Sequence, residues 1–266
     1  MHRSRAAGQR RRRKSRGIVK PPIRAIGFDL GETLLFYRDT PLNWASLYPD
    51  ALGAVARVCG ASPSPEQFAA AGQILRQHNT RIVPRTREVS AGKILSPILK
   101  AWSLDPTAHL SAAIETFFRF FQQHLCVYPE TASVLTALRE RHIPTGILTD
   151  VPYGMPRAFV QCDLADAGLS NLFDALLTSV EVGVRKPEAA GYRELAAHLG
   201  VEPREMLYVG NEAKDVIGAN RAGAQSAFLD RENTGASHGQ DFTISTLAGV
   251  CEIMRNTRAV AVELRT

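Results

Sequence analysis

Residues 24–34, Arg-Ala-Ile-Gly-Phe-Asp-Leu-Gly-Glu-Thr-Leu, decide the fold of this 266-residue chain. An apolar run of strand length, 23–28, leads directly to a carboxylate, Asp29, and a hydroxyl, Thr33, follows four residues later. A carboxylate held by donors and a cation can accept a transferred group covalently and divide one difficult displacement into two easier ones. The stretch therefore predicts a nucleophile at the end of a strand. An ordinary strand-to-helix turn, capped by Thr33, is the structural alternative.

Length and composition indicate a globular protein with one main core and an inserted lobe. Apolar residues make up 45% of the chain and charged residues 22%, which is typical of soluble domains. No stretch approaches the length of a membrane span. The four cysteines are far apart and match no zinc or redox spacing, so we expect reduced thiols and a cytoplasmic protein. They are Cys59, Cys126, Cys162 and Cys251.

The net charge of +6 comes from the N-terminus. Residues 1–24 hold ten Lys and Arg and no acid, which leaves 22 basic and 26 acidic residues and a net charge of about −4 in the rest. Residues 1–22 are expected to form a disordered basic arm, because the basic run 10–14 with Ser, Gly and Gln around it cannot bury apolar surface. No aromatic residue is interleaved with the arginines. We therefore expect a solvated arm and no specific nucleic-acid binding, with an organellar transit peptide or an arm upstream of the true start as open alternatives.

A helical insertion is predicted at 38–125. Apolar residues recur there at helical spacing, and prolines separate the segments. Four phenylalanines between 117 and 121 are expected to form a core face of the last helix rather than a substrate pocket. The four expected helices are 44–59, 65–78, 91–102 and 110–125.

The pattern changes at Pro129 to helices that alternate with short apolar strands, which predicts parallel strands joined by crossovers. The core is thus predicted at 23–37 and 126–240, with a C-terminal helical segment at 241–266. The expected strands are 143–148, 173–178, 206–209 and 227–229, the last of these being the final core strand. The expected helices are 130–142, 156–169, 188–199 and 215–222.

Polar residues follow four of the predicted strands: Asp29, Thr149, Lys186, and Asn211 with Asp215. Ligands bind at the carboxyl edge of such parallel sheets, so these side chains are expected to converge on one crevice. Each has a structural alternative as a helix cap, a turn or a solvated lysine. Their joint order carries the functional prediction.

This order resembles the haloacid dehalogenase superfamily, in which aspartate-based phosphatases are common. The family's four motifs correspond here to 29–33, 146–150, Arg185-Lys186-Pro187 and 210–215. The resemblance implies an α/β fold with a Rossmann-like parallel sheet and crossover helices. The insertion at 38–125 is similar in position and length to the family's helical cap of the first type.

The resemblance also implies roles. Asp29 would be the nucleophile toward a small phosphorylated metabolite, Thr149 would bind a phosphoryl oxygen, and Lys186 would neutralise charge. Asp150 would join Thr149 and Lys186 in binding substrate. The metal would be Mg²⁺, which takes carboxylate, carbonyl and amide oxygens as ligands. Its implied ligands are Asp29, the carbonyl of Gly31, Asn211 and Asp215.

Two positions depart from the phosphatase pattern. Gly31 stands where those enzymes have an aspartate that protonates the leaving group, and losing such an acid typically costs about 10² to 10⁴ in rate. Glu32 is adjacent, but its side chain is expected to point elsewhere. Asn211 replaces an aspartate, so affinity for Mg²⁺ should fall without vanishing.

Two alternatives follow from these departures. The first is a catalytically impaired protein that binds a ligand or a partner protein. The second is a carbon-halogen hydrolase, although such members usually have tyrosine at the position of Gly31 and need no metal. The sequence names neither the substrate nor the oligomeric state. Four residues of the insertion are candidate substrate contacts or structural residues: Arg38, Trp44, Tyr48 and Arg85.

Overall fold

A six-stranded sheet forms the centre of the protein in a computed structural model, which describes residues 20–263 and side chains as far as residue 257. Its strand order is β5-β4-β1-β6-β7-β8, and every neighbouring pair is parallel. The strands are β1 (Ala25–Phe28), β4 (Thr145–Thr149), β5 (Ala175–Thr178), β6 (Met206–Gly210), β7 (Gln225–Leu229) and β8 (Phe242–Ile244). The fold is thus the α/β, Rossmann-like parallel sheet that the alternating pattern predicts.

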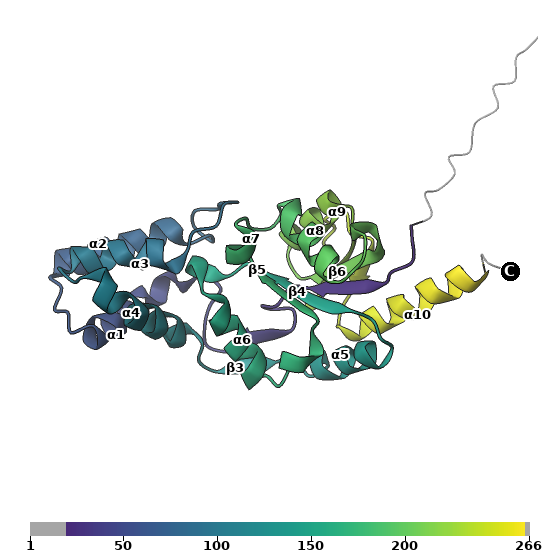
Figure 1. The fold of residues 1–266 in the computed structure, drawn as a ribbon, viewed down its shortest axis with the longest axis horizontal. Helices are drawn as coiled ribbons and strands as arrows, with labels where there is room; N and C mark the ends of the chain where they lie inside the picture. The colour runs from purple at the N-terminus through teal and green to yellow at the C-terminus, as the bar shows by residue number, and fades with distance from the viewer. Residues whose placement is uncertain (1–19, 264–266) are drawn as a thin grey trace, which may run out of the picture.

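Helices cover both faces of the sheet (Figure 1). The alternation of side chains along β1 explains why both faces need cover. Ile26 and Phe28 join the core under α5 (Thr131–Glu140) and α10 (Ala248–Glu263). Ala25 faces the other side, toward α8 (Ala189–His198) and α9 (Ala213–Ala222). Gly27 shares that side, where a Cβ would lie only 2.8 Å from a methyl carbon of Leu195. Glycine is therefore required for α8 to approach the sheet this closely.

The helices of the insertion form a separate lobe, the cap, at one end of the molecule (Figure 1). After a short 3₁₀ helix at Trp44–Leu47, its helices are α1 (Tyr48–Val58), α2 (Pro65–His78), α3 (Ala91–Ala101) and α4 (Pro106–Phe121). Two antiparallel strands connect the cap to the core, β2 (Leu35–Tyr37) and β3 (Leu125–Val127). The chain thus leaves and re-enters the core through adjacent strands.

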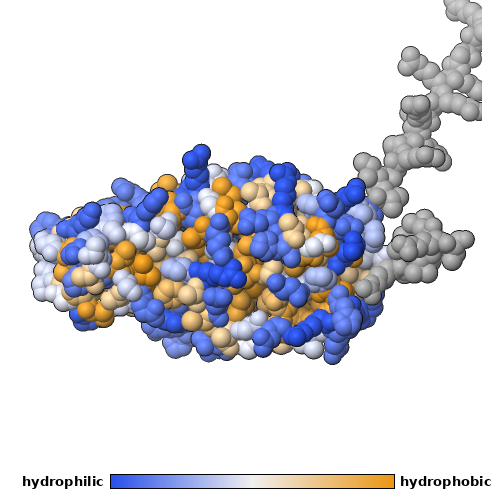
Figure 2. Space-filling model, viewed as in Figure 1, coloured by the Kyte–Doolittle hydropathy of each residue, from blue (hydrophilic) through white to orange (hydrophobic). Residues whose placement is uncertain are grey.

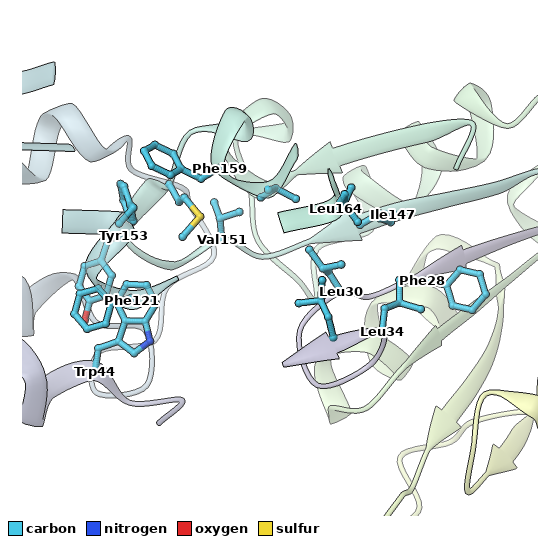
Figure 3. Packing of buried hydrophobic residues seen from close by; sticks show 14 of the residues in the cluster. Phe28, Leu30, Leu34, Trp44, Phe121, Ile147, Val151, Tyr153, Phe159 and Leu164 are labelled. Atoms are coloured by element: carbon cyan, nitrogen blue, oxygen red, sulfur yellow. The ribbon is translucent and has the colours of Figure 1, made fainter. Parts of the chain in front are cut away.

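Stacked aromatic rings join the cap to the core (Figure 3). The ring of Trp44 lies 3.8 Å from that of Phe121 and 5.3 Å from that of Tyr153, centroid to centroid. Tyr153 belongs to a 3₁₀ turn, Pro152–Gly154, that follows β4. Its hydroxyl lies 2.5 Å from that of Tyr48 on α1. The phenylalanines 117, 118 and 121 of α4 are buried, so the stripe is a core face, as predicted.

A second connection runs between the loop after α2 and the segment that precedes α8. Glu88 N donates to Gly183 O at 3.0 Å, and Arg185 N donates to Thr86 O at 2.7 Å. The Arg185 guanidinium and the Glu88 carboxylate form a buried ion pair across this bridge. The cap is therefore fastened to the core at a point well separated in sequence from β2 and β3.

Several elements differ from the sequence prediction. The strand β8 follows β7, so 227–229 does not contain the final core strand, and part of 241–266 is strand rather than helix. The helix α4 begins four residues earlier than expected because Asp105 caps it and Pro106 occupies the first turn. The strand β2 was not predicted, since three residues carry too little pattern.

Other sequence predictions concern the environment of the protein. None of the helices within residues 20–263 combines the length and apolar character needed to cross a bilayer. All four cysteines are free. Residues 1–19 of the predicted basic arm lie outside the described residues. Figure 2 shows a mostly hydrophilic surface over core and cap, interrupted by small apolar patches.

Replacing Phe121 by alanine should lower the free energy of unfolding by about 3–5 kcal/mol, because it empties a fully buried site against Trp44. Urea unfolding followed by circular dichroism measures the change. Phe120→Ala, at a half-buried neighbouring position on the same helix, should cost less. Equal losses in the two variants would contradict this account of the junction.

Candidate active site

The carboxyl ends of β1, β4 and β6 meet at one cavity of about 190 Å³. Asp29 follows β1, Thr149 ends β4, and Asn211 follows β6, and all three line this cavity together with Gly31. The strand order places β1 between β4 and β6, which is where the chain switches direction across the sheet. Such switch points are the usual ligand sites of parallel sheets.

Lys186 reaches this edge from the loop before α8, and its side chain is almost completely buried. Its Nζ donates to Asp29 Oδ1 at 2.5 Å and to Asp215 Oδ1 at 2.6 Å. A third bond of 3.2 Å goes to the hydroxyl of Tyr208. All three ammonium protons thus have acceptors, and the charge lies between two carboxylates.

Burial and charge set the protonation of this group. Burial raises the pKa of Asp29 to about 6, with the attraction of Lys186 opposing the shift and the repulsion of Asp215 adding to it. Burial lowers the pKa of Lys186, but the attraction of Asp215 and Asp29 outweighs it, so the net pKa lies well above its usual value. The lysine therefore stays charged beside the carboxylate of Asp29.

Asp215 holds Lys186 in place. One oxygen of its carboxylate accepts from Lys186, and the other accepts from the backbone N of Glu212 at 2.9 Å, in a capping box at the start of α9. A Cβ at Gly210 would lie 2.4 Å from the Asp215 side chain, so this approach requires glycine before Asn211. Asp215 does not line the 190 Å³ cavity.

The oxygen donors that do line the cavity suit a hard cation. Asp29 supplies a carboxylate, Asn211 an amide and Gly31 a backbone carbonyl, which is the donor chemistry that Mg²⁺ takes. Among the described residues, no group of three or more His, Cys, Asp and Glu side chains is arranged for a metal. The fit therefore rests on these mixed oxygen donors. Thr33 also donates to the Asn211 amide oxygen, at 3.2 Å, and so orients it.

Thr149 and Asp150 have different surroundings. Within the described part of the chain the Thr149 hydroxyl makes no hydrogen bond to protein, and the residue lines the cavity. The Asp150 carboxylate accepts from the backbone N of Lys186 at 3.0 Å and lies 3.5 Å from the Lys214 ammonium. Neither side chain caps the 3₁₀ turn that follows. Thr149 is thus available to a ligand, while Asp150 fixes the segment that carries Lys186.

Gly31 and Glu32 form the wall beside Asp29. A Cβ added at Gly31 would meet no atom within 4 Å, so the missing side chain leaves open space. Glu32 has a left-handed backbone with φ of 58° and is one of the residues that line the cavity. Tyr128 donates to its carboxylate at 3.1 Å. The Glu32 carboxylate is thus bound by a residue that does not itself line the cavity.

Sequence reasoning missed several residues of the site. Tyr208 accepts from Lys186 and donates to the carbonyl of Leu148, yet its position in a buried strand gave no signal beyond core. Glu88 in the cap loop belongs to no sequence motif that would have indicated its contact with Arg185. Of the four open candidates, Trp44 lines the cavity and Arg85 lines an adjoining one of about 280 Å³, which Lys186 also lines. Tyr48 is buried, and Arg38 is exposed.

Replacing Lys186 by methionine should lower the free energy of unfolding by about 3–5 kcal/mol near pH 8, because it leaves two buried carboxylates without their cation. Lys214→Met is the control. Lys214 pairs with Glu212 at a partly exposed position and should cost less than about 1 kcal/mol. Denaturant unfolding of both variants checks the prediction, and a loss no larger for Lys186→Met than for Lys214→Met would refute it.

Known phosphatases resemble this chain in sequence. A phosphoserine phosphatase from Thermus thermophilus is 36% identical over 118 residues, a match that covers 44% of this chain and 45% of the relative. The chain thus spans less than half the length of that relative. A phosphoglycolate phosphatase from Yersinia pestis is 24% identical, over 76% of this chain and 78% of the relative.

Solved structures share the fold. A 2-haloacid dehalogenase from Pseudomonas syringae superposes with a TM-score of 0.64 at 20% identity, covering 88% of this chain and 99% of that one. The family model for haloacid dehalogenase-like hydrolases matches residues 23–223, which include Asp29, Thr149, Lys186 and Asp215. The chain therefore belongs to the haloacid dehalogenase-like hydrolases.

Proposed function

We propose that this hydrolase is a Mg²⁺-dependent phosphatase that releases phosphate from a small phosphorylated metabolite through an aspartyl-phosphate at Asp29. The observation that carries the proposal is the buried Lys186 ammonium on Asp29, at the edge of a cavity that a ligand can enter. Relatives named as phosphatases support the same chemistry.

Each side chain has a defined task in this proposal. Lys186 holds Asp29 Oδ1, and no described residue hydrogen-bonds Oδ2, which is left to attack phosphorus. The bond between phosphorus and the leaving oxygen breaks as the bond to Oδ2 forms. The Thr149 hydroxyl donates to a phosphoryl oxygen, and Lys186 offsets the charge. Attack by water then breaks the bond between phosphorus and Asp29 and frees phosphate.

The proposed Mg²⁺ would be held by Asp29, the Gly31 carbonyl and Asn211, with Asp215 behind them. Bound there, the metal would neutralise charge on the transferred phosphoryl group. The leaving oxygen takes its proton from water, since Gly31 offers no acid.

A catalytically impaired binding protein is the competing function, and the absence of a side chain at Gly31 favours it. The two functions differ in turnover. An enzyme of the proposed type releases phosphate in a metal-dependent manner, whereas a binding module retains ligands without releasing phosphate. A carbon-halogen hydrolase would instead release halide from a haloacid without metal.

Asp29→Asn should lower phosphate release from an aryl phosphate by at least about a thousandfold, because an amide does not form the covalent intermediate. Release by the unaltered protein should require Mg²⁺ and stop with a chelator. Asp166→Asn, an exposed aspartate on α6 (Arg157–Asp166), is the matched control and should behave as the unaltered protein does. Full activity of Asp29→Asn would exclude the covalent route.

Gly31→Asp should raise the turnover of an alkyl phosphate by about a hundredfold, because it places an acid where space is open. The gain should be smaller with an aryl phosphate, whose leaving group needs little protonation. Gly31→Asn has the same size without the acid and should show no gain. Steady-state kinetics on both esters measures the effect, and equal gains from both variants would argue against protonation as the cause.

A further inference from the structure

Beyond the reaction centre, the cavity has an apolar wall. The wall combines a residue of β2, the loop that follows it, the start of the cap and the turn after β4. The aromatic ring of Trp44 is fixed there by stacking on Phe121 and Tyr153, so this surface is preformed. Leu42 lies at the mouth, with 58% of its surface exposed. The side chains that make this wall are Phe36, Pro41, Leu42, Trp44, Pro152 and Tyr153.

The cations around the same cavity are already neutralised. Arg81, from the cap loop, lies 2.5 Å from the Glu212 carboxylate. Lys214 lies 2.6 Å from the same carboxylate and 3.5 Å from Asp150, and Arg185 is paired with Glu88. Every lysine and arginine in this lining, all of them described residues, therefore has a carboxylate partner.

The remaining ionisable side chains of the lining disfavour a second anion. Burial and the nearby Arg85 lower the pKa of His78, so it is neutral near pH 7. Three lysine and arginine residues line the cavity, and the acidic residues outnumber them. The four acids are Asp29, Glu32, Asp150 and Glu212. A carboxylate on the substrate would thus meet acids and no spare cation.

The leaving group is restricted as well. Because Gly31 supplies no acid and the space beside it is empty, a strongly basic alkoxide would depart slowly. A phenolate departs with little protonation. An aromatic leaving group also suits the apolar wall, since aromatic rings pack favourably against each other.

We infer that the substrate is a phosphate monoester with an uncharged, apolar and weakly basic leaving group, of the aryl type, and not a carboxylated phosphate. The inference rests on the proposed function, because it takes a phosphate ester as the occupant of the cavity. It goes further in stating what lies on the far side of the ester bond: a flat apolar group against Trp44 and Leu42.

Three esters test it: phenyl phosphate, 4-carboxyphenyl phosphate and benzyl phosphate. The first two differ in one carboxylate, and the phenol of the second is no more basic. The kcat/KM for phenyl phosphate should exceed both others by at least about tenfold. Equal values for phenyl and 4-carboxyphenyl phosphate, or a preference for the carboxylated ester, would overturn the inference while the phosphatase function stands.

Leu42→Arg supplies a cation at the mouth and should reduce the preference for phenyl over 4-carboxyphenyl phosphate by about tenfold. Val58→Arg is the matched control, because Val58 is 59% exposed on α1 and does not line the cavity. It should leave the preference unchanged. An unchanged preference in Leu42→Arg, or the same change in both variants, would count against the inference.

Binding separates failure of the inference from failure of the proposed function. Phenylphosphonate and phosphonoacetate are not hydrolysed by phosphatase chemistry, and calorimetry gives their Kd values with Mg²⁺ present. If no ester releases phosphate, the phosphatase proposal fails. In that case tighter binding of phenylphosphonate would still support the apolar ligand class, whereas equal or undetectable binding would overturn it.

Discussion

The site depends on one buried ion group, the ammonium of Lys186 between the carboxylates of Asp29 and Asp215. Buried charges are costly unless they are paired and fully hydrogen-bonded, and this lysine meets both conditions. Much of the neighbouring structure serves that arrangement. The absence of a side chain at Gly210 leaves room for Asp215, and the capping box of α9 orients its carboxylate. The hydroxyl of Tyr208 accepts the third hydrogen bond of Lys186. The Lys186 charge, which would assist phosphoryl transfer, therefore also constrains the packing of β1, β4 and β6.

Residues of the cap also serve two purposes. Its aromatic residues fill the junction with the core and also form the wall of the cavity. Arg185 precedes Lys186 and pairs with Glu88 of the cap loop, so the segment that presents Lys186 is held from both sides. The same residues thus pack the junction and line the cavity. For this reason most side chains of the lining already contact other protein groups.

Much of the architecture could be predicted from the sequence, because periodicity and turns are local signals. The helix 65–78 was predicted to the residue, since apolar spacing and prolines mark it, and the structure adds a capping box at its start. The convergence of Asp29, Thr149, Lys186 and Asn211 followed from strand order. Contacts between residues that are distant in sequence and belong to no motif could not be predicted. Glu88 lies in a loop, Tyr208 reads as core, and the strand β8 is only three residues long. The left-handed backbone of Glu32 was not predicted, because it leaves no mark in the sequence beyond one glycine.

The bridge between residues 86–88 and 183–185 has a consequence for how molecules enter and leave. A lobe joined to its neighbour only through two adjacent strands can swing about them as a hinged lid. Here a second connection, beside Lys186, opposes that rotation, because backbone hydrogen bonds and a buried ion pair would have to break together. With the cap held at two places, the cavity opens to solvent at its rim, where exposed Leu42 and the Arg81–Glu212 ion pair lie.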